Sequence, residues 1–220
     1  MKKRILITGA SGMIGQGILN LALESNEVSE IISLVRKPSR QVHSKLIEIV
    51  VKNFSDLSEH QSVFEQIDAA YFCIGVYTGQ VKDDLFKTIT VDYPTVFAQL
   101  LKQKSPEAKL CFLSGAGADK TEKSKTAFAK YKGMAENNLH ETGLKVFSFR
   151  PGYIYPVVPR KEPNLMYKIM RVLYPILKAF GNKYSIKSSD LGQAMFLIGL
   201  NGFTQETLEN IDIVNYIETK

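Results

Sequence analysis

The chain is poor in several features that would mark particular classes of protein. It has no tryptophan, two cysteines and three histidines in 220 residues. Two cysteines cannot hold together a disulfide scaffold, and the cysteines and histidines show no metal-ligand spacing, so we expect no metal site. No apolar run reaches the length of about 18 residues that suggests a membrane helix, and no secretory leader is recognisable. We therefore expect a cytoplasmic protein with reduced thiols and no membrane span.

The charge is positive but not concentrated. Lysine and arginine number 28 against 22 acidic residues, a net charge of +6. The lysines are spread along the chain and are not interleaved with aromatic residues as in nucleic-acid-binding motifs, so we expect no nucleic-acid partner. A dispersed basic surface would instead favour an anionic small molecule. The length suits one α/β domain spanning residues 1–220.

A glycine-rich turn lies close to the N-terminus. Ile5–Ile7 predicts a strand, residues 16–23 predict a helix, and Thr8–Gly15 between them carries a glycine at every third position from Gly9. In a strand–turn–helix unit, such a turn presents backbone N–H groups to the pyrophosphate of a dinucleotide. The residues predicted to bind the cofactor here are Gly9, Ser11, Gly12, Met13, Ile14 and Gly15.

Strand-like and helix-like segments alternate after this turn. The order predicts an α/β fold, a doubly wound parallel sheet flanked by helices. The expected strands are Arg4–Thr8, Glu30–Val35, Leu46–Val51, Ala69–Ile74, Lys109–Ser114 and Lys145–Phe149. The expected helices are Ile14–Ser25, Leu57–Gln66, Asp84–Lys104 with a bend near Pro94, and Thr126–Glu141.

The last third of the chain has a different character. Residues 150–156 contain prolines and a glycine and predict an irregular loop, and Asn164–Phe180 predicts an apolar helix with basic residues. Ser188–Asp190 resembles an N-cap before a helix over 191–200. We interpret residues 151–190 as the substrate side of the site, with the apolar helix as a pocket lid or a homodimer contact.

Four short segments together carry a resemblance to a known family. They are Thr8–Gly15, Leu113–Asp119, Lys132–Glu136 and Phe149–Gly152. In this order they resemble the atypical short-chain dehydrogenase/reductases, nearest to the Tat-interacting-protein-like branch, over essentially the whole chain. The resemblance implies a Rossmann fold, a nicotinamide dinucleotide and a Ser–Tyr–Lys catalytic group. It also implies that Lys132 binds the nicotinamide ribose and that Pro151 and Gly152 shape the nicotinamide pocket.

Two hydroxyls of that catalytic group are absent. Phe128 stands four residues before Lys132, where the family has tyrosine, and Gly115 stands where the second serine is expected. Tyr131 adjoins Lys132, so on a helix it points about 100° away. The strand phase of Ser114 also argues against a substitute role. Since a general acid contributes roughly 10²–10⁴ in rate, ordinary alcohol–ketone chemistry is not expected, and Lys132 is the remaining catalytic candidate.

The segment after the second predicted strand favours NADP(H). NAD-selective sites place an acid about 20 residues beyond the glycine turn, whereas residues 33–40 contain none. Arg36 stands there instead, and a guanidinium can stack on adenine and pair with a 2′-phosphate. NAD(H) stays the alternative. Asn53 is predicted to bond the adenine edge, Phe54 to cover the base or belong to the core, and Gly75 to approach the ribose or simply end a strand.

Two functions therefore remain open. The first is an oxidoreductase that transfers hydride between NADP(H) and a small organic substrate without the usual tyrosine. The second is a non-catalytic dinucleotide sensor or scaffold that binds a partner protein. The missing hydroxyls of Phe128 and Gly115 favour the second, and the retained Lys132 favours an intact nicotinamide end.

Overall fold

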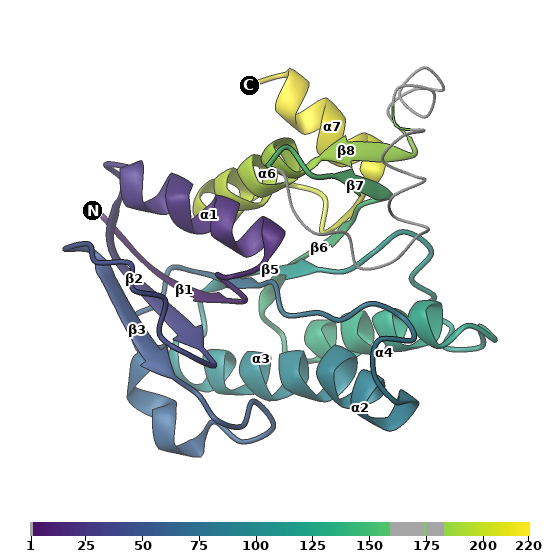
Figure 1. Cartoon of the computed structure of the whole chain (residues 1–220), viewed down its shortest axis with the longest axis horizontal. Helices are drawn as coiled ribbons and strands as arrows, with labels where there is room; N and C mark the ends of the chain where they lie inside the picture. The colour runs from purple at the N-terminus through teal and green to yellow at the C-terminus, as the bar shows by residue number, and fades with distance from the viewer. Residues whose placement is uncertain (1, 159–173, 175–182) are drawn as a thin grey trace.

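A parallel sheet forms the centre of the molecule. The computed structural model describes residues 2–158, 174 and 183–220, and within this part the main sheet has seven strands in the order β3-β2-β1-β4-β5-β6-β9 (Figure 1). Every neighbouring pair in it is parallel. The strands are β1 (Lys3–Thr8), β2 (Val28–Val35), β3 (Leu46–Val50), β4 (Ala69–Phe72), β5 (Lys109–Leu113), β6 (Lys145–Arg150) and β9 (Thr207–Glu209).

The strand order reverses beside β1, which in doubly wound sheets is where a ligand crevice is expected. From β1, the third strand in this order, the chain runs outward to β2 and β3 and then crosses back to form β4 on the other side of β1. Ligands of doubly wound sheets bind beyond the carboxyl ends of the strands at such a switch point. The predicted doubly wound parallel sheet is confirmed, and the turns that follow β1 and β4 border the crevice.

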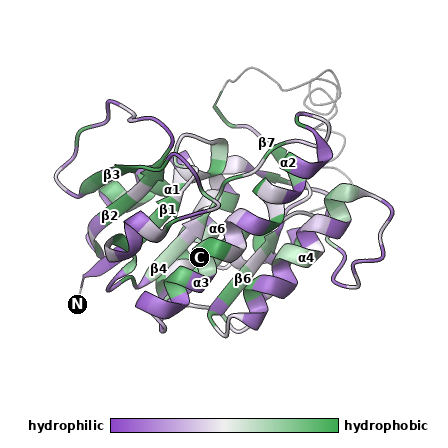
Figure 2. Cartoon of the chain, turned by 90° about the horizontal axis from the view of Figure 1, so that it is seen from below, coloured by the Kyte–Doolittle hydropathy of each residue, from purple (hydrophilic) through white to green (hydrophobic). Residues whose placement is uncertain are grey.

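Helices cover both faces of the sheet. One face carries α1 (Met13–Glu24), α6 (Ser188–Asn201) and α7 (Asn210–Glu218); the other carries α3 (Tyr93–Lys104) and α4 (Ala127–Glu141) (Figure 1). Ile5 and Ile7 of β1 belong to the first core and Leu6 to the second. Because both faces are buried, the central strands are apolar at successive positions. The outer helices show alternating hydrophilic and hydrophobic stretches in Figure 2.

Two predicted helices have a different geometry. The segment expected as a helix over 57–66 is a short 3-10 helix, η1 (Ser58–Phe64), whose His60 has non-helical angles. The helix expected over 84–104 consists of α2 (Asp83–Lys87), a π-helical turn, η2 (Thr88–Asp92), and α3. Pro94 lies in the first turn of α3, where a missing N–H costs little.

The C-terminal third departs most from the sequence prediction. The segment expected as an irregular loop contains β7 (Tyr153–Tyr155), which pairs in parallel with β8 (Ser185–Lys187). The N-cap prediction at Ser188–Asp190 is wrong, because α6 begins at Ser188 itself. Neither β9 nor α7 was predicted. Of the helix predicted over 164–180, the structure describes Tyr174 alone, and the rest of it lies outside the described residues.

None of the helices that the structure describes has the length and apolar character of a membrane span.

Candidate functional site

The glycine turn between β1 and α1 is shaped by close backbone packing. Gly9 has φ of 72°, in the left-handed region, and a Cβ there would lie 2.7 Å from the main-chain carbon and oxygen of Cys73. A Cβ on Gly15 would lie 2.2 Å from the carbonyl oxygen of Gly9. The turn therefore packs against the end of β4 on one side and against the first turn of α1 on the other, and both glycines are sterically required.

The tip of this turn is open. Ser11 and Gly12 are exposed, and the only described atom within 4 Å of a Cβ on Gly12 is the Gly9 carbonyl oxygen at 3.1 Å. Gly12 is the N-cap residue of α1, and among the described residues no side chain caps this helix end. The first amides of a helix, here from Met13 onward, lack intrahelical acceptors and lie at the positive end of the helix dipole. The turn thus leaves backbone donors for an anion.

The adenosine end is predicted beside β2 and β3. Arg36 is exposed directly after β2. Asn53 is exposed too, and its Oδ1 accepts a 3.0 Å hydrogen bond from the Ser55 amide, which leaves the contact with adenine a prediction. Phe54 is 4% exposed, and its ring lies 5.8 Å from that of Tyr93. Phe54 is therefore a core residue, the second of the two roles considered for it.

A carboxylate that the sequence search did not consider reaches the same loop. Glu48, on β3 opposite Ser33, accepts a 2.8 Å hydrogen bond from the amide of Ser39. Residues 33–40 contain no acid, and Glu48 reaches this region only because β3 pairs with β2. It holds the loop after Arg36 against the sheet edge.

Gly75 follows β4 on the crevice side. It is exposed, and no described atom lies within 4 Å of a Cβ placed on it. Cys73, two residues earlier, is half-buried, and burial raises the pKa of its thiol to about 12. Gly75 therefore borders open space, as a glycine that approaches a ligand would, while the Cys73 thiol stays protonated.

Lys132 is a buried ammonium at the end of β5. It is 8% exposed, its Nζ donates a 2.8 Å hydrogen bond to the Leu113 carbonyl, and it lies 4.8 Å from the centre of the Phe112 ring. Burial lowers its pKa to about 8, against the opposing attraction of the Glu136 carboxylate. An ammonium carries three donors, and the described residues provide Lys132 with one hydrogen-bond acceptor. It has the capacity to bind ribose hydroxyls as well.

The two hydroxyls nearest to Lys132 in sequence or strand position are engaged elsewhere. The hydroxyl of Ser114 donates to Glu136 Oε1 at 2.6 Å. The phenol of Tyr131 donates to Asp83 Oδ2 at 2.7 Å. Both side chains are held by carboxylates, so neither takes the place of a hydroxyl at residue 128 or 115.

Phe128 and Gly115 lie in direct contact. Gly115 is buried after β5, Phe128 is half-buried in the first turn of α4, and a Cβ on Gly115 would lie 2.5 Å from Cζ of the ring. The two positions where the resemblance implies hydroxyls are therefore packed against each other.

Pro151 and Gly152 join β6 to β7. The Pro151 carbonyl accepts a 2.9 Å hydrogen bond from the amide of Ala116, and the Gly152 amide donates to Asn210 Oδ1 at 2.8 Å. A Cβ on Gly152 would lie 2.4 Å from the Tyr184 carbonyl oxygen. Gly152 is thus required by packing next to β8, and its predicted role at the nicotinamide pocket stays a prediction.

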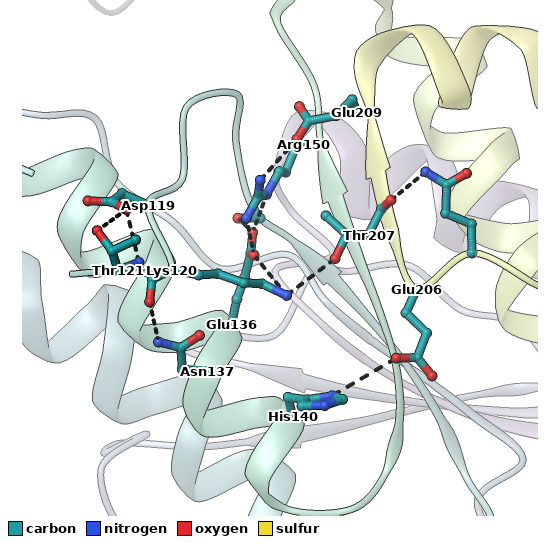
Figure 3. A network of polar contacts seen from close by, with 12 residues as sticks. Asp119, Lys120, Thr121, Glu136, Asn137, His140, Arg150, Glu206, Thr207 and Glu209 are labelled. Atoms are coloured by element: carbon teal, nitrogen blue, oxygen red, sulfur yellow. Dashed lines mark hydrogen bonds and ion pairs between the residues drawn. The ribbon is translucent and has the colours of Figure 1, made fainter. Parts of the chain in front are cut away.

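The buried carboxylate of Glu136 connects α4 with neighbouring strands of the sheet. Glu136, 1% exposed, accepts hydrogen bonds from Arg150 Nε at 2.9 Å and Nη2 at 2.6 Å (Figure 3). Arg150 Nη1 donates to Glu209 at 2.9 Å, and Lys120 Nζ lies 3.9 Å from Glu136. The hydrogen bonds with Glu136 raise the pKa of Arg150. This network links α4 to β6 and β9. In the sequence, Glu136 stands out only as the last residue of the Lys132–Glu136 motif, and its place in the network is not predicted.

Comparison with known proteins places these features in a family. A family model described as NAD(P)H-binding matches residues 9–175. The Bordetella bronchiseptica enzyme WbmH in complex with NAD+ has a similar structure, with a TM-score of 0.72 and 16% identity over 99% of this chain and 80% of that chain. A putative NAD-dependent epimerase/dehydratase from Bacillus halodurans has a TM-score of 0.67 and 18% identity over 99% of this chain and 100% of that chain.

A further solved structure, MoeE5 in complex with UDP-glucose and NAD, has a TM-score of 0.69 and 13% identity over 98% of this chain and 81% of that chain. At these identities the structural likeness concerns the fold alone.

Proposed function

Since the chain belongs to the NAD(P)H-binding family and has the fold of the atypical short-chain dehydrogenase/reductases, we propose that it binds NADP(H) and transfers hydride between this cofactor and a small organic substrate. The observation that carries the proposal is the open glycine turn at the switch point, with uncapped α1 amides at one end of the crevice and buried Lys132 at the other. We take residues 1–220 as one binding unit and 151–190 as its substrate side.

Each part of the crevice has a proposed task. The amides of Met13 to Gly15 hold the pyrophosphate, and Asn53 and Gly75 lie beside the adenosine and ribose. Lys132 donates to the nicotinamide ribose with the N–H groups that Leu113 does not use. The bound nicotinamide supplies the hydride chemistry. The free thiols of half-buried Cys73 and buried Cys111 suit a reducing compartment, and we place the protein in the cytoplasm.

The preference for NADP(H) over NAD(H) depends on Arg36. Its exposed guanidinium follows β2, where a 2′-phosphate on the adenosine ribose would lie. Glu48, the acidic residue that reaches the same loop, already accepts a hydrogen bond from the amide of Ser39. We therefore propose Arg36 as the residue that meets the 2′-phosphate.

Titration of the protein with NADPH and with NADH, followed by nicotinamide fluorescence, tests this preference. We expect NADPH to bind about tenfold more tightly, a difference of about 1.4 kcal/mol, and Arg36→Ala to remove most of that difference. Arg40→Ala is the matched control, because Arg40 is exposed in the same loop, and it should leave the ratio unchanged. Tighter binding of NADH by the unaltered protein would refute the role of Arg36.

A non-catalytic dinucleotide sensor that binds a partner protein is the second candidate. The observation in its favour is the absence of hydroxyls at Phe128 and Gly115. A sensor of this kind would bind NADPH with the same residues and leave it unoxidised with every acceptor offered, whereas the first candidate oxidises it.

A further inference from the structure

The ring of Phe128 meets Gly115 with its tip. Measured from a Cβ on Gly115, the ring's Cζ lies at 2.5 Å, Cε1 at 3.2 Å and Cε2 at 3.5 Å. Cζ is the nearest ring atom, with Cε1 and Cε2 at comparable larger distances on either side, so the long axis of the ring points at Gly115. The position where a tyrosine would carry its oxygen is therefore directed into the backbone after β5.

The contact between Phe128 and Gly115 leaves no space for either hydroxyl that the family resemblance implies, that of a tyrosine at residue 128 or that of a serine at residue 115. A phenol oxygen on residue 128 would run into Gly115 in this rotamer, and a side chain on residue 115 would run into the ring of Phe128. Ser114 and Tyr131 already donate to Glu136 and Asp83. We take the half-buried ring of Phe128, which lies one helical turn before Lys132 on α4, as the apolar wall of the site.

A wall of this kind restricts the chemistry of the hydride acceptor. Hydride added to a simple aldehyde or ketone leaves a localised alkoxide, which must be protonated or hydrogen-bonded as it forms. A planar conjugated acceptor spreads the same charge over its own atoms and presents a flat apolar surface to an aromatic wall. The buried Lys132 ammonium provides a positive charge at the same end of the site.

We propose that the substrate is a planar conjugated acceptor of the quinone class, and that Phe128, seated on Gly115, is the specificity-determining residue that selects it. This inference rests on the proposed function. The quinone takes up hydride from the reduced nicotinamide and becomes a hydroquinone anion with its charge delocalised over the ring. Water then supplies the proton that completes the hydroquinone, and the cofactor is left oxidised.

The test compares two acceptors of similar size in the presence of NADPH: menadione, a quinone, and naphthaldehyde. The loss of NADPH absorbance is followed for the unaltered protein, Phe128→Ala and Phe128→Tyr, with a blank that lacks protein. We expect menadione to be reduced at least about tenfold faster than naphthaldehyde, and Phe128→Ala to raise the KM for menadione about tenfold. NADPH affinity should stay within about twofold in both variants. Phe128→Tyr alone should not gain naphthaldehyde reduction.

A double-mutant cycle in urea tests the contact separately from turnover. Gly115→Ala should lower the unfolding midpoint of the unaltered protein and should have a much smaller effect in a Phe128→Ala background, because the ring is then gone. Additive effects would overturn the contact. NADPH binding without menadione reduction, or equal rates with both acceptors, would overturn the quinone inference and leave cofactor binding standing. Failure to bind NADPH would overturn the proposed function itself.

Discussion

The two ends of the proposed cofactor site differ in what forms them, backbone at one end and side chains at the other. The β1–α1 turn is backbone: Gly9 and Gly15 leave no space for side chains, and the tip at Gly12 is open. The end of β5 is built from side chains: Lys132 is buried, and the ring of Phe128 rests on Gly115. Backbone amides at a helix N-terminus can bind a pyrophosphate whatever side chains surround them, whereas side chains decide which chemistry follows. The first end can keep its function while the second changes.

We expect the largest effect from Gly15→Ala, which disturbs the backbone packing of the β1–α1 turn. Its Cβ would lie 2.2 Å from the Gly9 carbonyl, and neither backbone segment can yield without moving β1 or α1. We expect a loss in the free energy of unfolding beyond the roughly 3 kcal/mol of ordinary overpacking, together with loss of NADPH binding. Urea denaturation and fluorescence titration measure the two quantities.

Gly17→Ala is the matched control on the same helix. No described atom lies within 4 Å of a Cβ there, and alanine favours a helix over glycine by about 1 kcal/mol. This variant should be slightly more stable and bind NADPH normally. Similar losses in both variants would show that helix α1 tolerates no added methyl group, rather than that the turn is tightly packed.

Glu136→Gln should lower the stability of the protein by a smaller amount, through the buried ion pair between Glu136 and Arg150. The substitution leaves the Arg150 guanidinium without its buried counter-charge, and Glu209 remains its exposed partner. We expect a loss of about 3 kcal/mol in the free energy of unfolding. Glu206→Gln is the control, since the Glu206–Lys145 pair is nearly half exposed and should contribute less than about 1 kcal/mol. Equal losses for the two variants would contradict the assigned role of the network.

Lys132→Met should change the stability of the apoprotein and its affinity for NADPH in opposite directions. Burial disfavours the charged form of Lys132, so its removal should stabilise the apoprotein by about 2 kcal/mol at pH 7 while NADPH affinity falls. The unfolded chain holds the proton up to pH 10.5 and the folded protein only to about 8, so the native protein gains stability between these values. The advantage of Lys132→Met should therefore shrink across this window. A constant advantage in urea titrations from pH 7 to 10.5 would show that folding does not lower the pKa of Lys132.

Sequence patterns were most informative where a single element carried the signal. The apolar runs predicted the six strands β1 to β6, because a strand covered on both faces needs apolar residues at successive positions. They missed β7, β8 and β9, which have three residues each and are defined by their pairing partners. The start of α7 had a readable signal in Glu209 and Asp212, which form a capping box. Glu48 was not predictable for the same reason as the short strands, since only strand pairing brings it to Ser39.

The sequence by itself determined the glycine turn between β1 and α1, because glycine spacing acts locally: Gly9 needs a positive φ, and Gly15 lies in the first turn of the helix that follows. The sequence also showed that residues 115 and 128 lack hydroxyls. Only the tertiary structure decided that the ring of Phe128 points at Gly115 and that Lys132 loses its hydration shell against β5. Such contacts join a strand end to a helix further along the chain, and the folded geometry alone sets which atoms meet and how much water remains between them.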